Sequence, residues 1–101
     1  MRLAEAHELI VKALELAPGD PLITDSLAWV MFRMGQSEEA VRLLQQALAK
    51  KPEAEIAAHL GEVLWSLNRQ SEALDVWREG VALNPANDTL LQTLKRLGVS
   101  L

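Results

Sequence analysis

The chain has 101 residues, of which half are hydrophobic and 24% are charged, a balance typical of a folded domain. Ten Lys and Arg against fourteen Asp and Glu give a net charge of −4, and the basic residues do not form the patch that nucleic-acid binding requires. Cysteine is absent, which excludes disulfides, thiolate metal sites and thiol catalysis. No apolar run reaches the about 20 residues of a transmembrane helix, so we expect no membrane insertion by this segment.

Six helices are predicted in chain order, because apolar residues recur at spacings of three and four and no strand pattern competes. The connections between them are short, so neighbouring helices should pack antiparallel. The expected ranges are about 3–17, 22–34, 37–50, 54–67, 70–83 and 87–97.

Helix boundaries are indicated by local chemistry. Asp20 and Pro21 can cap and start the second helix. Gly35 and Asn68 occupy equivalent places after the second and fourth helices, and both residue types tolerate the left-handed conformation that ends a helix.

The chain repeats itself with a period of 33 to 34 residues. Three sets of residues share this spacing: Ala6, Ala40 and Ala73; Ala13, Ala47 and Gly80; Pro18, Pro52 and Pro85. Together with "HLG" at 59–61, these small residues and prolines resemble tetratricopeptide (TPR) repeats. The resemblance implies an all-α, TPR-type right-handed superhelix of antiparallel helix pairs.

One TPR domain is expected over residues 1–101. Its predicted parts are a second helix of a truncated repeat at 1–20, full units at 21–53 and 54–86, and a C-terminal capping helix and tail at 87–101. The first helix carries an apolar face without a predicted partner on its N-terminal side, formed by Leu3, Ala6, Ile10, Ala13 and Leu14.

Small residues are predicted where the paired helices approach each other. Ala40 and Ala73 should pack against Ala28 and Gly61, since a large side chain would hold the helices apart. Larger side chains should fill the remaining core: Leu27, Met31, Leu44, Leu60, Leu64 and Trp77.

Enzyme motifs are lacking. His7 and His59 belong to no metal-ligand pair, and the glycines stand alone, so no phosphate loop can be drawn. A trio of Asp25, Ser26 and His59 could be imagined as hydrolytic, although a helix-starting Asp-Ser and a packing histidine explain it as well. We therefore predict a noncatalytic protein with no cofactor and no metal.

A docking surface is suggested by helical geometry. With Leu27 at zero and about 100° per residue, Trp29 lies near 200° and Arg33 near 240°, away from the packing side. The resemblance to TPR proteins implies that this side of each first helix lines a partner-binding groove. The candidate groove residues are Asp25, Trp29, Phe32, Arg33, Glu62 and Trp65. Scaffold roles stay open for the three aromatic residues among them.

The expected partner is a protein or peptide. The Lys, Asn and Arg residues with which some TPR domains grip a C-terminal carboxylate are replaced here by others, including Asp25 and Glu62. We therefore expect a ligand with apolar side chains and some positive charge. Homo-oligomerisation through the N-terminal helix is the alternative function.

A closer resemblance concerns "DSLAW" at 25–29 and "IAAHLGEVLW" at 56–65, which are similar to the C-terminal repeats of long bacterial envelope-associated TPR adaptors. This resemblance implies part of a longer scaffold that recruits a protein such as a protease or an assembly factor. It also implies a periplasmic or outer-membrane lipoprotein parent; without it, a cytoplasmic one is expected.

Overall fold

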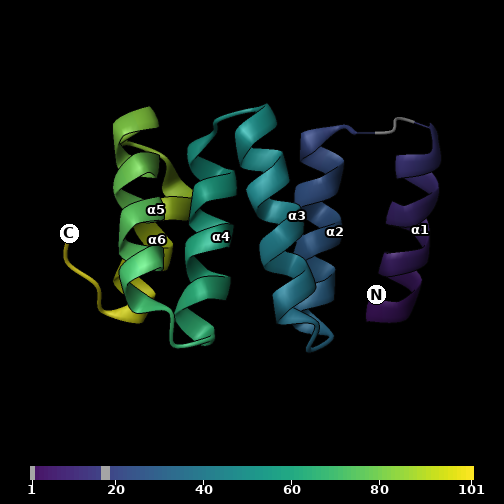
Figure 1. Cartoon of the computed structure of the whole chain (residues 1–101), viewed down its shortest axis with the longest axis horizontal. Coiled ribbons are helices and arrows are strands. Elements are labelled where there is room, and N and C mark those ends of the chain that lie inside the picture. The colour runs from purple at the N-terminus through teal and green to yellow at the C-terminus, as the bar shows by residue number, and fades with distance from the viewer. Residues whose placement is uncertain (1, 17–18) are drawn as a thin grey trace. The chain divides into compact units, whose positions relative to one another are not determined.

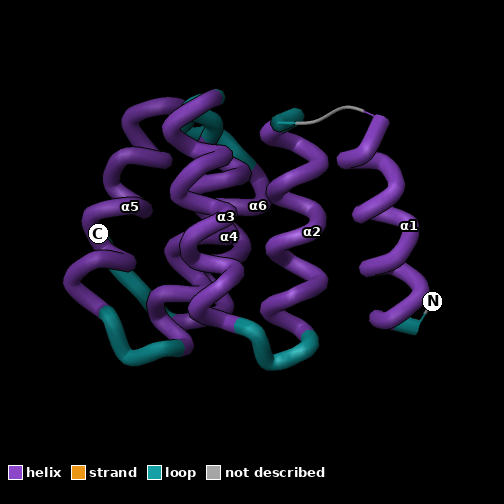
Figure 2. The backbone as a smooth tube through the Cα atoms, turned by 45° about the vertical axis from the view of Figure 1, so that its right-hand side comes forward, coloured by secondary structure: helices purple, strands orange, loops and turns teal. Residues whose placement is uncertain are grey.

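The computed structural model describes residues 2–16 and 19–101, and in that part of the chain it consists of helices and short loops (Figures 1 and 2). Two compact units divide it, Met1–Lys51 with three helices and Pro52–Leu101 with three more. The helices are α1 (Leu3–Leu16), α2 (Pro21–Arg33), α3 (Ser37–Lys50), α4 (Ala54–Ser66), α5 (Gln70–Leu83) and α6 (Asp88–Leu97).

All six predicted helices are confirmed, with ends within about one residue of the expected ones. The predicted extension of the first helix to residue 17, Pro18 and the Leu14 side chain lie outside the described residues. In the first unit, α2 packs against both α1 and α3; in the second, α4 packs against both α5 and α6.

The start of α2 follows from the predicted capping chemistry. The Asp20 carboxylate accepts hydrogen bonds from the backbone N–H groups of Leu22 at 2.9 Å and Ile23 at 3.2 Å. Pro21 occupies the first helical position, where its missing N–H has no intrahelical acceptor to lose. Asn87 starts α6 similarly and accepts from the Leu90 N–H at 2.9 Å.

The helices α2, α4 and α6 end in the same way. Each end has a residue with a positive φ: 86° at Gly35 and 61° at Asn68, which follow the C-caps of α2 and α4, and 70° at Gly98, which is itself the C-cap of α6. The following N–H then reaches back to a carbonyl in the last turn, as from Gln36 to Met31 at 2.8 Å and from Arg69 to Leu64 at 2.9 Å. The predicted left-handed roles of Gly35 and Asn68 are confirmed, and α6 ends like a first helix of a repeat.

The core of the first unit is built around small residues, as predicted. Ala28 on α2 and Ala40 on α3 are fully buried, and Leu27 and Leu44 are buried with them. Met31 is only half-buried, so the prediction that it fills the core is wrong. Met34, the last residue of the predicted range 22–34, follows the end of α2 at Arg33 and is 41% exposed.

The core of the second unit centres on Trp77. This residue of α5 is fully buried, and its indole lies directly over Gly61 of α4. A Cβ atom on Gly61 would stand 2.0 Å from the indole Nε1, a distance that no real side chain could accept. The Trp77 Nε1–H donates a hydrogen bond to the Ala58 carbonyl at 3.3 Å. The nearest side chain to Gly61 is therefore that of Trp77, and not the predicted Ala73.

Gly80 is a second close approach in this unit. A Cβ atom there would lie 3.0 Å from the Ala57 Cβ of α4 and 3.1 Å from the Leu90 Cδ2 of α6. The absence of a side chain on Gly80 thus lets α5 approach both neighbouring helices.

We predict that Ala73→Leu destabilises the protein by about 1–3 kcal/mol, because Ala73 is fully buried and the added atoms would overpack the contact between α4 and α5. Thermal and urea unfolding followed by circular dichroism measure the loss. Ala82→Leu, at an exposed position of the same helix, is the control and should leave the midpoint nearly unchanged. Equal midpoints for the two variants would contradict the packing.

Candidate functional site

The side of α2 away from the core carries a stripe of accessible side chains. Trp29 is half-buried and keeps part of its ring accessible, whereas Leu27 and Ala28 beside it are buried. The stripe continues in both directions along the helix. Its members, at spacings of four, three and four residues, are Leu22, Ser26, Trp29 and Arg33. We call these four residues the α2 stripe.

Trp29 and Phe32 form an aromatic pair next to this stripe. Their ring centroids are 5.2 Å apart, with the planes inclined at 45°, within the range of favourable edge contacts between rings. Phe32 is half-buried. The Trp29 ring is thus in contact with Phe32, while part of its surface stays accessible.

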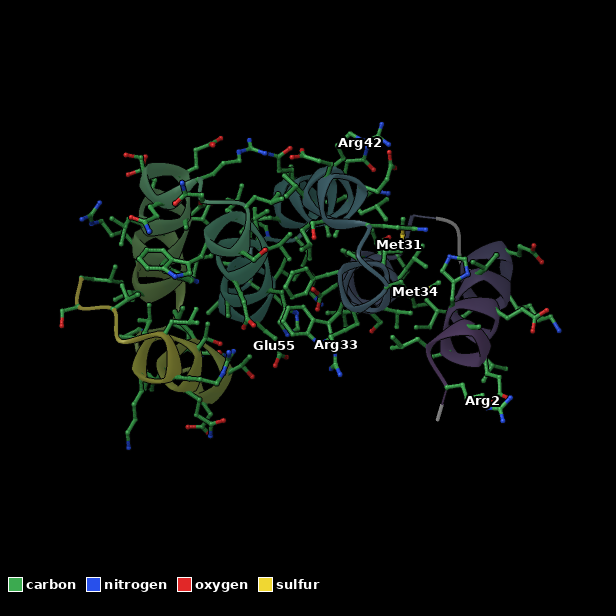
Figure 3. The ribbon with its side chains drawn as sticks, turned by 90° about the horizontal axis from the view of Figure 1, so that it is seen from below. Arg2, Met31, Arg33, Met34, Arg42 and Glu55 are labelled. Atoms are coloured by element: carbon green, nitrogen blue, oxygen red, sulfur yellow. The ribbon has the colours of Figure 1, made fainter. Side chains whose placement is uncertain are left out.

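Arg33 is the last residue of α2 and is exposed; Figure 3 shows its side chain extending away from the helix. It forms no ion pair with a described residue of its own unit. Asp25, by contrast, is only 7% exposed and is already engaged in an interaction. Of the two charged groups expected on this helix, the structure leaves only the guanidinium widely accessible.

In the second unit, Trp65 of α4 contacts the buried Trp77. The two ring centroids are 5.5 Å apart with an interplanar angle of 39°, and Trp65 is half-buried. One side of Trp65 thus supports the core of its hairpin. This contact favours the scaffold role that the sequence left open, although part of the ring stays accessible.

Glu62 is held by the last helix. Its carboxylate forms an ion pair with Arg96 of α6, and the Glu62 side chain is 14% exposed. Two turns earlier on α4, the Glu55 carboxylate accepts a hydrogen bond from the Thr89 hydroxyl of α6 at 2.5 Å. The Glu62 carboxylate thus links α4 to α6, and its role in the groove stays a prediction.

These two polar contacts between α4 and α6 were not predicted from the sequence, although their spacing in the sequence could have indicated them. Glu55 and Thr89 are 34 residues apart, and so are Glu62 and Arg96. Residues one period apart occupy equivalent places on successive first helices, so complementary polar side chains at that separation predict a contact. That Trp29 and Trp65 line the same partner-binding groove stays a prediction.

One shallow pocket lies between the start of α2 and the end of α3, and another between the start of α4 and the end of α5; neither is lined by a predicted site residue. The pocket in the first unit has a volume of about 450 Å³ and is lined by Gly19, Pro21, Thr24, Gln46, Ala47, Ala49 and Lys50. The other, of about 320 Å³, is lined by Pro52, Glu53, Ala54, Glu55, Leu83, Asn84 and Asn87.

Other chemistry is limited in the described residues. Histidine and acidic side chains there form no group of three or more that could hold a metal ion. The hydrogen bond from Arg69 lowers the pKa of the exposed Glu72 carboxyl, a local surface pair one turn into α5. Nor does any helix in that part of the chain combine the length and apolar character required to cross a bilayer.

The sequence profile of the tetratricopeptide repeat family matches residues 2–63, which is more than half of the chain and includes the α2 stripe. The chain belongs to the tetratricopeptide repeat family. The predicted TPR resemblance is thus confirmed, and the TPR fold is that of a protein–protein interaction module in general, whose members are typically noncatalytic.

Two curated TPR proteins are similar in sequence. The TPR repeat-containing protein PA4667 of Pseudomonas aeruginosa is 50% identical over 96 residues, which are 95% of this chain and 16% of that protein. The small glutamine-rich TPR-containing protein 2 of Mycosarcoma maydis is 31% identical over 90 residues, 88% of this TPR chain and 26% of the relative. The chain thus spans about a quarter or less of the length of these relatives.

Solved structures share the fold. TTC0263, a TPR protein of Thermus thermophilus, superposes with a TM-score of 0.83 at 24% identity and covers 96% of this chain and 50% of that one. MamA superposes with a TM-score of 0.74 at 20% identity over 95% of this chain and 59% of its own. The predicted all-α TPR fold class is confirmed by these likenesses.

Proposed function

We propose that this TPR chain is a noncatalytic adaptor, part of a longer scaffold, that docks a protein partner on the exposed side of α2. The observation that carries the proposal is the half-buried Trp29, which keeps part of its ring accessible and lies about 160° around α2 from the buried Leu27. A large aromatic group kept in contact with solvent by a well-packed helix is a typical anchor of an interface.

The surroundings of Trp29 support a binding surface. Phe32 fixes its ring from one side, and Leu22, 47% exposed, adds apolar surface two turns earlier on the α2 stripe. Arg33 supplies a charge at the end of the stripe that can orient the partner. Trp65, with part of its ring accessible, is a second proposed contact in the other unit.

We predict that Trp29→Ala weakens binding of the partner by at least about tenfold, because truncation removes the central apolar contact of the stripe. The partner is first captured on the tagged wild-type protein from a lysate of the source organism and identified. Its dissociation constant for purified wild type and variant is then measured by isothermal titration calorimetry, with circular dichroism to establish equal helix content.

Leu9→Ala is the matched control, since Leu9 is an apolar residue of the same unit that is 55% exposed but lies on α1. It should leave the affinity unchanged. Equal binding by wild type and Trp29→Ala would remove α2 from the interface, and a loss with Leu9→Ala alone would move the interface to α1.

Self-association is the second candidate function, and one observation favours it. None of the α1 side chains that the structure describes is fully buried, whereas the equivalent helices α3 and α5 each bury several. Ala6 keeps part of its surface accessible, although Ala40 and Ala73, its counterparts in the repeat, have none. The described side chains of α1 thus keep apolar surface that is accessible for a contact.

If α1 mediates self-association, the wild-type protein should show a molar mass that rises with concentration, and Leu9→Glu should abolish the rise by placing a charge in the interface. Multi-angle light scattering at several concentrations measures this. The control is Lys12→Glu, at an exposed position of the polar side of α1. A strictly monomeric wild-type protein would exclude the self-association function.

A further inference from the structure

The charge of the partner can be inferred from the charges that the structure leaves accessible. The sequence favours a positively charged ligand because Asp25 and Glu62 are expected on the docking side. In the structure, Asp25 is buried and engaged, and Glu62 is paired with Arg96. The basis for a positively charged partner is therefore gone.

On α2 itself, the accessible charge is positive and not negative. Between Pro21 and Arg33 the helix has only two charged residues, Asp25 and Arg33, and of these only Arg33 is exposed. Its guanidinium extends into solvent at the end of the α2 stripe (Figure 3). A partner lying along the stripe would thus meet the apolar surfaces of Leu22 and Trp29 first and a cation at the end.

We infer that the partner of the α2 stripe is an acidic amphipathic segment, whose apolar side chains cover Leu22 and Trp29 and whose carboxylate faces Arg33. The inference rests on the proposed docking function and adds the chemistry of the ligand. A guanidinium binds a carboxylate through two parallel N–H groups, which fixes the direction of the segment along the helix as well as its charge.

The net charge of the protein makes this inference testable. At a net charge of −4, non-specific attraction favours a basic peptide over an acidic one. A preference for the acidic peptide can therefore arise only from a local positive group at the docking surface. Arg33 also lies at the C-terminal end of α2, where a cation stabilises a helix, but that structural role does not distinguish between peptides.

The probes are two synthetic amphipathic peptides that share one apolar face of Leu and Phe and differ only in carrying Glu or Lys beside it. Calorimetry at low salt measures their affinities for the whole chain, and two-dimensional NMR of the Trp indole N–H groups locates the binding. We expect the Glu peptide to bind about fivefold more tightly, with the difference shrinking as salt is added.

Arg33→Glu should reverse the preference in favour of the Lys peptide, and Arg33→Gln should remove it without introducing a new charge. Lys12→Glu changes the net charge as much as Arg33→Glu but lies on α1, so it should keep the preference for the Glu peptide. Wild-type protein that binds the two peptides equally, prefers the Lys peptide, or binds neither would overturn the inference.

Failure of the proposed function has a different signature. If Trp29→Ala binds both peptides as wild type does, the α2 stripe is not the docking surface. If Trp29→Ala loses both peptides while wild type prefers the Lys peptide, the surface stands and the acidic partner is excluded.

Discussion

The contact between Gly61 and Trp77 is the constraint on which the second unit depends. The indole of Trp77 occupies the space that any Cβ on Gly61 would need, and the same ring is hydrogen-bonded to the Ala58 carbonyl and fully buried. Burying an indole removes about 150–250 Å² from water, a large share of what one helix pair can contribute. The close approach of α4 and α5 therefore has both a steric requirement and an apolar driving force.

The first unit meets the same requirement with different residues. Ala28 and Leu44 stand 33 residues before Gly61 and Trp77, and all four are buried. In the first unit these two positions hold an alanine and a leucine; in the second they hold a glycine and an indole, beside which only hydrogen fits. The two units thus fill equivalent buried positions with different pairs of residues.

The packed side of α2 is determined by its buried residues, and the other side carries accessible ones. Leu27 and Ala28 anchor α2 in the core, and Trp29 is consequently turned outward together with Arg33. The sequence predicts the helix ends and the buried small residues well, because both depend on local sequence signals. It does not predict that α2 stops one residue before Met34 or that Asp25 is buried. The angle of a residue on its own helix does not reveal which other groups engage that side, as Arg96 engages Glu62.

The most direct test of the account is a double-mutant cycle at Gly61 and Trp77, measured as free energies of unfolding in urea. Ala favours a helix over Gly by about 1 kcal/mol, so Gly61→Ala should stabilise the Trp77→Leu background, which reproduces the pair of the first unit. In the presence of Trp77 the same substitution should instead destabilise the protein, because the buried indole cannot move aside. An effect of the same sign and size in both backgrounds would contradict the claim that this contact controls the approach of α4 and α5.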